Sequence, residues 1–449
     1  MSEKKQIDFT TGRISRKMLL FSWPIFFANL LQTSYQFIDS LWVGNLLGAG
    51  ALGAISISAT VIFTILSFII GVNGASLTIL SQYRGAKDEE GLKKALNAFV
   101  FVLGTMTLVL SLVGFLFAGP ILSFLGTPDS IYPVALSYLQ INFIGILFLF
   151  GYNFIGTVLR AMGDSKTPVR FVLIAVILNT VLDPLFIAGF NMGIEGAALA
   201  TIVSQGIAFI YGLWFSIRKA DVPFSKPQLP SKLQFIQLFK LGLPSGLSMM
   251  AISGGVMAIM GVVATFGEEV VAGFGAAQRI DSLIMLPAMT LGSAVNSMAG
   301  QNIGANQWRR VSEITKNGIY LILSVTLLIS TIAFIWSRFF ISLFIDDPET
   351  IEFGASYLRT VAFFYPFLGI NFVLNGIVRA AGAMVPVLVL NIISFWLLRY
   401  PLTYLFAKWY GEQGIALGMG VSFIISSFIA SGYYLFGKWR KKVVINEKS

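Results

Sequence analysis

Long apolar stretches separated by short polar segments run along almost the entire chain. A window of about 20 apolar residues, the length that crosses the hydrocarbon core of a bilayer as a helix, finds such stretches throughout the sequence. They cover residues 18–43, 52–81, 95–118, 134–159, 169–190, 194–215, 235–266, 271–299, 318–336, 355–378, 385–407 and 415–436. Segments of alternating polarity, which mark the strands of an outer-membrane barrel, do not occur. The pattern predicts an all-α polytopic membrane protein with about twelve transmembrane helices.

The overall composition excludes a soluble domain of this length. Hydrophobic residues make up 56% of the 449 residues, and charged residues make up only 12%. A soluble domain carries about twice that share of charge, and the mean hydropathy of +0.80 points the same way. We therefore expect an integral, multi-pass protein of the plasma membrane.

The distribution of lysine and arginine predicts the orientation of these helices. Every second loop is basic, whereas the loops between them are neutral or acidic. The basic segments contain Lys4, Lys5, Arg13, Arg16 and Lys17; Arg84, Lys87, Lys93 and Lys94; Arg218, Lys219, Lys226, Lys232 and Lys240; and Lys438, Arg440, Lys441 and Lys442. Because basic loops stay on the cytoplasmic side, both termini are predicted to be cytoplasmic. The net charge of +10 then reflects topology, and we expect no nucleic-acid partner.

The chain contains no cysteine and no histidine. Their absence removes thiol nucleophiles, disulfides, imidazole bases and the usual zinc ligands. No glycine-rich phosphate loop lies beside paired acids at a membrane surface. We therefore expect neither an enzyme nor a bound cofactor or metal, and any proton carrier has to be a carboxylate.

An internal repeat divides the chain into two halves. Three motifs recur in the same order at an offset of about 219 residues (301 − 82 = 219), which is the signature of a duplicated unit. They are Gln82-Tyr83-Arg84-Gly85-Ala86 and Gln301-Asn302-Ile303-Gly304-Ala305, Ser137-Tyr138-Leu139 and Ser356-Tyr357-Leu358, and Arg160-Ala161-Met162-Gly163 and Arg379-Ala380-Ala381-Gly382. Each half contains six of the predicted helices, so both copies cross the membrane in the same direction.

The repeat predicts the domain organisation. We expect an N-terminal six-helix lobe over residues 1–219, a cytoplasmic linker over 220–232, and a C-terminal six-helix lobe over 233–449. Two parallel copies should be related by a pseudo-two-fold axis along the membrane normal. Transporters are often built in this way, with the substrate path between two related bundles.

Two aspartates interrupt the apolar stretches of the first half. Asp39 lies near the outer end of stretch 18–43, and Asp183 lies in stretch 169–190, while the second half has no acid at the corresponding places. Counting about 1.5 Å per residue from the outer ends puts both acids in one layer. Acids within the membrane are costly and are usually functional.

Polar neighbours surround both acids at helical spacing. On the first helix, Asn29, Gln32, Gln36 and Asp39 form one stripe, with Tyr35 one turn from Asp39; on the fifth, Asn179 lies one turn before Asp183. Pro184 removes a backbone donor next to Asp183, which frees a local carbonyl. Tyr138 and Asn142 on the fourth helix and Thr201 on the sixth can reach the same layer.

These motifs resemble the multidrug and toxic compound extrusion (MATE) family, and in particular its DinF branch. The resemblance covers essentially the whole chain and rests on the order and spacing of several segments. They are Phe37-Ile38-Asp39-Ser40 with Gly44, the two Gln-x-x-Gly-Ala motifs, the loop from Arg160 to Pro168, and Asp183-Pro184 followed by Gly193-Ile194-Glu195-Gly196-Ala197-Ala198. The resemblance implies two six-helix lobes around a V-shaped cavity and export of amphipathic, usually cationic compounds by antiport.

The resemblance also implies roles for individual residues. Asp39, Asn179, Asp183 and Thr201 match first-lobe positions that the family uses for proton or cation handling. The second-lobe acids of the NorM branch are missing, because the seventh helix carries no Glu and the tenth has Asn371 and Asn375 instead. A sodium site of that type in the second lobe is therefore not expected.

We hypothesise that a proton and a cationic drug compete for one site. A buried carboxylate loses solvation in its charged form and is readily neutralised by a proton, whereas an approaching cation favours the charged form. Protonation from outside would then release the drug after the lobes rock outward. The predicted coupling residues are Asp39, Asp183, Asn179 and Thr201, and the predicted drug-binding residues are Asp39, Tyr35, Gln36, Gln32, Tyr138, Asn142, Met257 and Met285.

Several alternatives stay open at this point. Na⁺ could replace H⁺ at the two acids, and a flippase for a lipid-linked or polysaccharide precursor would instead grip pyrophosphate with buried cations. Asp39 and Asp183 could also be structural, and the methionines could be packing residues. Arg279, Asp281 and Arg399 in the second half are either a structural group or a second coupling site. We expect a monomer, since two lobes already enclose a path.

Overall fold

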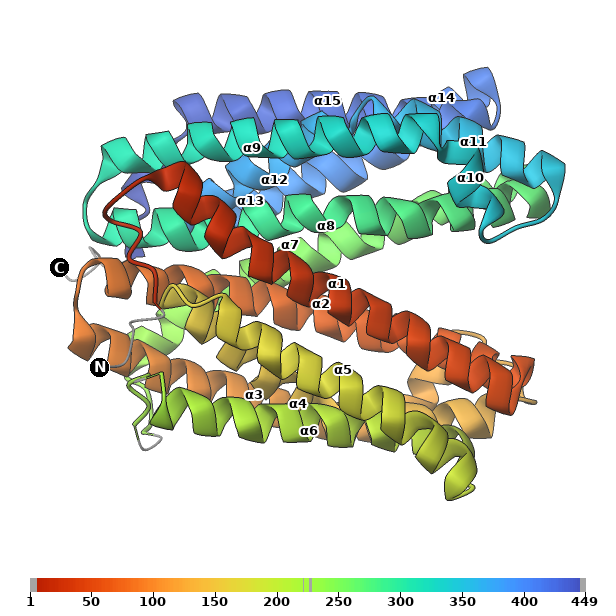
Figure 1. The fold of residues 1–449 in the computed structure, drawn as a ribbon, viewed down its shortest axis with the longest axis horizontal. Coiled ribbons are helices and arrows are strands. Elements are labelled where there is room, and N and C mark those ends of the chain that lie inside the picture. Colours follow the sequence, from red (N-terminus) through yellow and green to blue (C-terminus); the bar gives the residue numbers. More distant parts are fainter. Residues whose placement is uncertain (1–5, 221, 226–227, 445–449) are drawn as a thin grey trace. The chain divides into compact units, whose positions relative to one another are not determined.

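The structure, a computed structural model, describes residues 6–220, 222–225 and 228–444, and these residues are almost entirely helical (Figure 1). The first half contains α1 (Ile14–Leu47), α2 (Ala49–Gly85), α3 (Glu89–Phe124), α4 (Tyr132–Ala161), α5 (Lys166–Pro184), η1 (Leu185–Gly189) and α6 (Gly193–Arg218). The second contains α7 (Lys232–Val263), η2 (Ala264–Phe266), α8 (Glu268–Gly304), α9 (Trp308–Ile335), α10 (Ser337–Ser342), α11 (Pro348–Ala362), α12 (Tyr365–Ala380), α13 (Met384–Ile392), η3 (Ile393–Arg399), α14 (Tyr400–Tyr410), α15 (Gln413–Phe436) and η4 (Lys438–Lys441). Lys4 and Lys5 of the predicted cytoplasmic N-terminal segment and Lys226 of the predicted linker lie outside the described residues.

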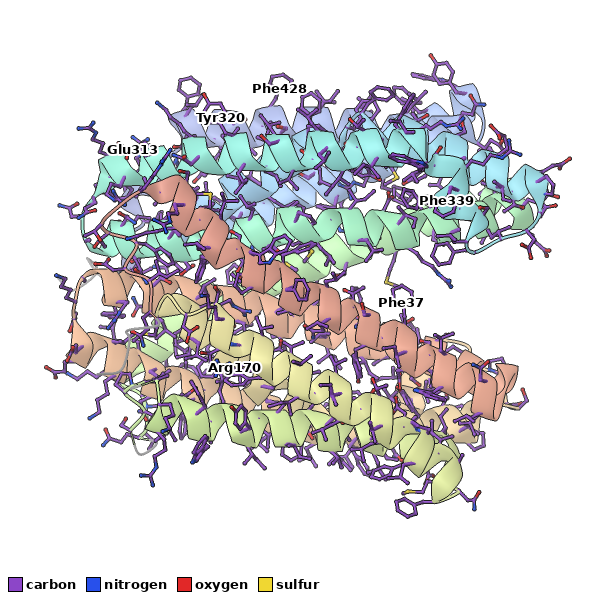
Figure 2. The ribbon with its side chains drawn as sticks, viewed as in Figure 1. Phe37, Arg170, Glu313, Tyr320, Phe339 and Phe428 are labelled. Atoms are coloured by element: carbon purple, nitrogen blue, oxygen red, sulfur yellow. The ribbon has the colours of Figure 1, made fainter. Side chains whose placement is uncertain are left out.

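The predicted membrane-spanning class is confirmed. Within the described residues, ten helices are long and apolar enough to cross a bilayer, and α11 and α12 together have the length and hydropathy of a further broken span or a re-entrant loop, bent by 53° at the break between them. α1 has 34 residues but is not among the ten, since its polar stripe lowers its hydropathy. Large apolar side chains face outward along these helices, as Tyr320 and Phe428 do (Figure 2), which suits a lipid environment.

Both halves interrupt their fifth predicted span with a π-helical segment. In the first half, α5 ends at Pro184 and continues as η1; in the second, η3 ends at Arg399, two residues before Pro401. Proline cannot donate the backbone hydrogen bond that regular helix requires, and such π-turns are frequent at functional sites. The irregular backbone thus lies beside Asp183 in one half and at Arg399 in the other.

The contacts divide the chain into two compact units, residues 1–7 with 23–240 and residues 8–22 with 241–449. In the first unit, α4 packs against α2, α3 and α6. In the second, α12 packs against α8, α9 and α15, and a Cβ on Gly376 would lie 2.4 Å from the carbonyl oxygen of Gly292. The absence of a side chain at Gly376 therefore lets the backbones of α8 and α12 touch.

The first residues of α1 pack with the second unit, a placement that no sequence pattern indicated. Before α1 begins, the Arg310 side chain donates hydrogen bonds of 3.1 Å to the carbonyl oxygens of Phe9, Thr11 and Gly12. Asn302 donates another of 3.1 Å to Phe9. The backbone groups that precede the helix thus find their partners on α8 and α9.

Candidate functional site

The two predicted acids meet inside the first unit. Asp39, on α1, and Asp183, in the last turn of α5, are close enough for their side chains to hydrogen bond to each other. Asp183 has no exposed surface. Two carboxylates at this separation cannot both be ionised at low cost, because like charges in a poorly solvated place repel strongly. The pair needs one proton, or a bound cation, to be stable.

A short hydrogen-bond network holds Asp183 in place. The side-chain amide of Asn179, one turn earlier on α5, donates to Asp183 Oδ1 at 3.0 Å and to the hydroxyl of Thr201 on α6 at 3.3 Å. The hydroxyl of Tyr35 on α1 also donates to Thr201, at 3.1 Å. The helices α1, α5 and α6 therefore supply three predicted residues, Tyr35, Asn179 and Thr201, around the acid pair, and the structure brings them together.

Three buried oxygen atoms of this cluster have no donor. They are Asp39 Oδ1, Asp183 Oδ2 and Asn179 Oδ1. Buried polar atoms nearly always have a partner, so these oxygens mark a place where a proton or a small cation can be taken up. Neither carboxylate is paired with a lysine or arginine among the described residues. The described residues also contain no cluster of three or more acids that could hold a metal ion.

The other predicted first-half residues occupy different surroundings. Tyr138 is buried and close enough to both acids to interact with their charges. Asn142 donates back to the carbonyl oxygen of Tyr138 on its own helix at 2.9 Å. Gln36 is exposed, and Gln32 lines a pocket beside the acid cluster.

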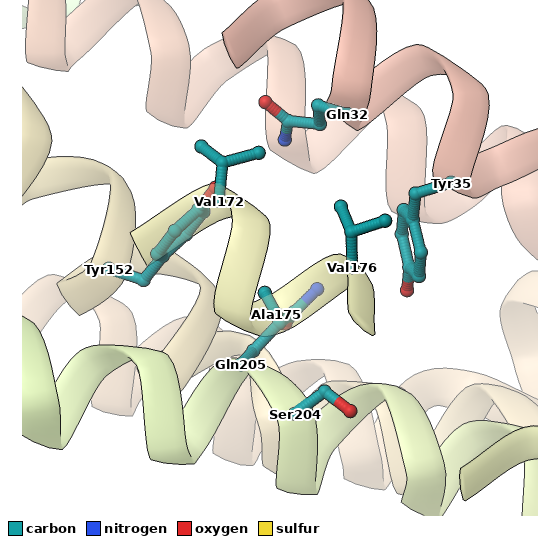
Figure 3. Close-up of a pocket in the computed structure, with 8 residues that line it drawn as sticks. All are labelled: Gln32, Tyr35, Tyr152, Val172, Ala175, Val176, Ser204 and Gln205. Atoms are coloured by element: carbon teal, nitrogen blue, oxygen red, sulfur yellow. The ribbon is translucent and has the colours of Figure 1, made fainter. Parts of the chain in front are cut away.

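That pocket lies between α1, α4, α5 and α6 of the first unit and contains about 300 Å³ of empty space, part of it open (Figure 3). Its polar lining consists of Gln32, Tyr35, Tyr152, Ser204 and Gln205. The sequence analysis missed Tyr152, Ser204 and Gln205. A signal for two of them was present, because Ser204 and Gln205 follow Thr201 by three and four residues and so share its face of α6.

The predicted methionines belong to the second unit. Met257, on α7, has 50% of its surface exposed, and Met285, on α8, packs against the buried apolar core of its own unit. The acid cluster is built entirely from first-unit residues. Any drug-binding role of Met257 and Met285 therefore stays a prediction.

A second buried acid, Asp281, is held by two tyrosines in the second unit. The hydroxyl of Tyr357 donates to Asp281 Oδ2 at 3.0 Å, and the hydroxyl of Tyr365 donates to Oδ1. In place of a direct ion pair, Arg399 acts on Asp281 at longer range, while its guanidinium carbon lies 3.9 Å from the ring centre of Phe395. Unlike the first-unit pair, Asp281 has donors on both oxygens and a nearby positive charge.

Amides form a separate chain of hydrogen bonds in the second unit. Asn375 donates to Asn371 at 2.7 Å and to Asn391 at 3.4 Å, and Asn391 donates to the hydroxyl of Ser248 at 2.6 Å. The chain links α12, α13 and α7. It contains no acid, so it offers no charge for a cation.

Comparison with known proteins adds family information to this geometry. The family model described as MatE matches the chain twice, over residues 24–185 and 244–405. The same model thus matches both halves, as an internal repeat requires.

Named relatives match along the full length. The probable multidrug resistance protein YpnP of Bacillus subtilis is 55% identical over 99% of this chain and 100% of its own. The FAD transporter of Shewanella oneidensis is 27% identical over 96% of each.

Solved structures share the fold. A structure described as the outward-facing conformation of a multidrug resistance MATE family transporter of the MOP superfamily has a TM-score of 0.91 at 21% identity, covering 99% of this chain and 100% of that one. The Vibrio cholerae transporter VcmN in its bent form has a TM-score of 0.89 at 23% identity, covering 96% of this chain and 98% of that one.

Proposed function

Because the chain belongs to the MATE family, we propose that it is a multidrug efflux transporter that exports amphipathic, mostly cationic compounds in exchange for protons. It is a multi-pass protein of the plasma membrane with both termini in the cytoplasm, works by alternating access, and catalyses no chemical reaction. The name of the 55% identical relative, a probable multidrug resistance protein, supports a role in multidrug efflux.

The observation that carries proton coupling is the contact between Asp39 and Asp183. Asp39 is on α1 and Asp183 is on α5. Neither carboxylate has a basic partner among the described residues. One proton satisfies the pair by forming the hydrogen bond between them, and its loss leaves a net negative charge that attracts a cation. The same oxygens serve proton and drug, so the two occupants exclude each other.

This exclusivity produces exchange. In the inward-open state the drug displaces the proton, and in the outward-open state a proton from outside displaces the drug. Each proton that enters supplies about 1.4 kcal/mol per pH unit and about 2.3 kcal/mol per 100 mV of membrane potential. These energies are sufficient for a modest concentration gradient of an exported drug.

A sodium-coupled antiporter is the second candidate. Sodium would be bound by the oxygens of Asp39 and Asp183 together with Asn179 Oδ1, which is buried without a donor. A flippase for a pyrophosphate-linked precursor fits less well, because it needs accessible cations, whereas Arg399 is buried between the rings of Phe395 and Phe423.

The test is uptake of a fluorescent lipophilic cation into proteoliposomes under an imposed pH gradient without sodium. Wild type is compared with Asp39→Asn and Asp183→Asn. Gradient-driven uptake that both substitutions abolish supports proton exchange at this pair. Uptake that requires sodium would show that Na⁺ is the coupling ion instead of H⁺. Uptake that neither substitution affects would refute the shared site.

A further inference from the structure

The pocket beside the acid cluster contains a buried hydroxyl that no protein group satisfies. Ser204 has 1% of its surface exposed, and its Oγ has no hydrogen-bond partner among the residues that the structure describes. The side chain lines the pocket (Figure 3). A buried hydroxyl without a protein partner normally bonds to water. The space in the pocket that the centre of a water molecule can reach is about 20 Å³, and about 10–15 Å³ is enough to hold one water.

The pocket connects directly to the acid cluster. Tyr35 lines it and donates to Thr201, and Thr201 also accepts from Asn179, which bonds Asp183. Ser204 lies one turn after Thr201 on the same face of α6. A continuous polar route therefore runs from the carboxylates to the pocket.

The direction of the helices gives the route an orientation. On α1 the path goes from Asp39 through Tyr35 to Gln32, toward the start of the helix, where Arg13, Arg16 and Lys17 lie. On α6 it goes from Thr201 to Gln205, toward Arg218 at the end of the helix. Both ends are basic, and basic ends are the cytoplasmic ones.

The opposite wall of the pocket is apolar. Val172, Ala175 and Val176 of α5 form it. A path with hydroxyl and amide groups on one side and an aliphatic wall on the other can order one or two water molecules, and the lining residues include no charged group to hold an ion. This lining suits water better than a cationic drug.

We propose that this pocket holds the water through which the proton of the Asp39–Asp183 pair leaves toward the cytoplasm. The carboxyl O–H bond breaks as the proton passes to a water molecule, and each following water accepts one proton and donates one. The hydroxyls of Tyr35 and Ser204 accept and donate in the same way, so no group in the path changes its net protonation. The proposal rests on the proton exchange described under Proposed function and assigns the first part of the inward route, next to the acid pair.

The first test measures water directly. Hydroxyl-radical footprinting in lipid nanodiscs labels side chains that contact water, so Tyr35 and Tyr152 should be labelled at least threefold faster than Tyr138, which is buried outside the pocket. Ala175→Leu fills the pocket and should reduce the labelling of Tyr35 and Tyr152 severalfold without changing that of Tyr138. Equal labelling of all three tyrosines in the wild type would overturn the proposal.

The second test measures the proton. Ala175→Leu should slow pH-driven exchange about tenfold while leaving the equilibrium affinity for the drug unchanged, and Val176→Leu provides a smaller substitution in the same wall. Ile177→Phe adds bulk on the exposed face of α5 and serves as the control. Slowed exchange with a parallel loss of drug affinity would show that the pocket is a drug site. Unchanged exchange would exclude the pocket as the proton route. Either result overturns the proposal.

Proton coupling at the acid pair and the water route through the pocket can be refuted separately. If Asp39→Asn leaves proton-driven uptake intact, the proposed coupling fails whatever the footprinting gives. If Asp39→Asn abolishes uptake but Ala175→Leu changes neither labelling nor rate, only the water route fails.

Discussion

The hydroxyl of Tyr357 donates a hydrogen bond of 3.0 Å to Asp281 in the second unit, and Tyr357 occupies the repeat position of Tyr138 in the first. Both halves thus place the same tyrosine near a buried acid. The acids differ in their surroundings, because the positive charge of Arg399 acts on Asp281, whereas Asp39 and Asp183 have each other. The duplicated scaffold therefore supports a charge-compensated acid in one half and an uncompensated pair in the other.

This difference predicts that Asp281 is structural. Arg399→Met leaves the carboxylate of Asp281 buried without the nearby opposite charge, so the unfolding temperature in detergent should fall. The double variant Asp281→Asn/Arg399→Met should lose less stability than the two single variants lose together, because removing both charges leaves no uncompensated charge. Arg279→Met, at an exposed position of α8, is the control.

Transport separates the structural role from a coupling role. We expect Asp281→Asn to keep proton-driven uptake, measured per folded molecule, within about twofold of wild type, an energy difference below 1 kcal/mol. Complete loss of proton dependence in Asp281→Asn would show instead that the second half contains a coupling site.

Asn179 should tune the pH at which the first-unit pair gives up its proton. Its amide stabilises ionised Asp183 through the hydrogen bond of 3.0 Å, and hydrogen bonds to charged groups contribute about 1.5–3 kcal/mol. Asn179→Leu should therefore move the midpoint of pH-dependent drug binding upward by about one to two pH units. Asn153→Leu, whose amide bonds only its own helix at Leu149, should leave the midpoint in place. Drug binding with the same midpoint in Asn179→Leu would contradict the assigned role.

The membrane spans and the acid cluster could be predicted from sequence for one physical reason. A hydrocarbon core demands long apolar runs, so polar residues within such runs, like Asp39, Asn179 and Asp183, are conspicuous. The lipid-facing and buried faces of one helix are both apolar, however, and hydropathy does not separate them. Met257 is an example, because half of its surface is exposed and hydropathy does not show whether that surface contacts lipid or a substrate path.

Features that depend on distant partners could not be predicted. The pocket requires α4 and α6 to bring Tyr152 and Ser204 to one place, and although Ser204 shares a helix face with Thr201, nothing local marks Tyr152. The position of residues 8–22 depends on Arg310, almost three hundred residues further along the chain. The break before α12 had a local cause, since Pro366 lies in the first turn of that helix, but prolines also occur inside unbroken helices such as α8.

The close contact between α8 and α12 predicts that Gly376 tolerates no side chain. Gly376→Ala would bring a methyl group within 2.4 Å of a backbone oxygen, and overpacking of this kind costs about 1–3 kcal/mol. Gly275→Ala on α8 meets nothing within 4 Å and should be neutral or stabilising, because alanine favours helix by about 1 kcal/mol. Thermal unfolding of both variants should shift in opposite directions. A stabilised Gly376→Ala would show that the helices can separate.

Asp347 should make the start of α11 sensitive to acid. The side chain and then the backbone N–H of Thr350 donate hydrogen bonds to Asp347 and lower the pKa of its carboxyl below 3.8. A lowered pKa in the folded state means that the stabilisation is complete above the unfolded pKa and is lost as the pH falls through the folded value. The difference in unfolding temperature between wild type and Asp347→Ala should be constant above about pH 5 and should shrink toward pH 3. Asp346→Ala, which removes no cap, should differ little from wild type, and a constant difference for Asp347→Ala down to pH 3 would refute the ionised cap.

Arg310 should anchor the segment that precedes α1. Its guanidinium donates 3.1 Å hydrogen bonds to the carbonyl oxygens of Phe9, Thr11 and Gly12 and to the side chain of Asn302, and hydrogen bonds from charged groups contribute about 1.5–3 kcal/mol. Arg310→Ala removes the donor to the Gly12 carbonyl oxygen and one of two donors to the carbonyl oxygens of Phe9 and Thr11, which keep Asn302 and Lys17, so amide hydrogen exchange in residues 8–17 should accelerate at least tenfold.

The neighbouring arginine provides the matched control. The Arg309 side chain is 94% exposed and pairs only with Glu313 on the same helix, and exposed pairs contribute little. Arg309→Ala should therefore leave exchange in residues 8–17 unchanged, although both variants remove the same charge. Equal acceleration in the two variants would mean that net charge, rather than the contacts of Arg310, holds the segment. No acceleration in either would mean that Gln301 and Asn302, which bond Phe9, are sufficient on their own.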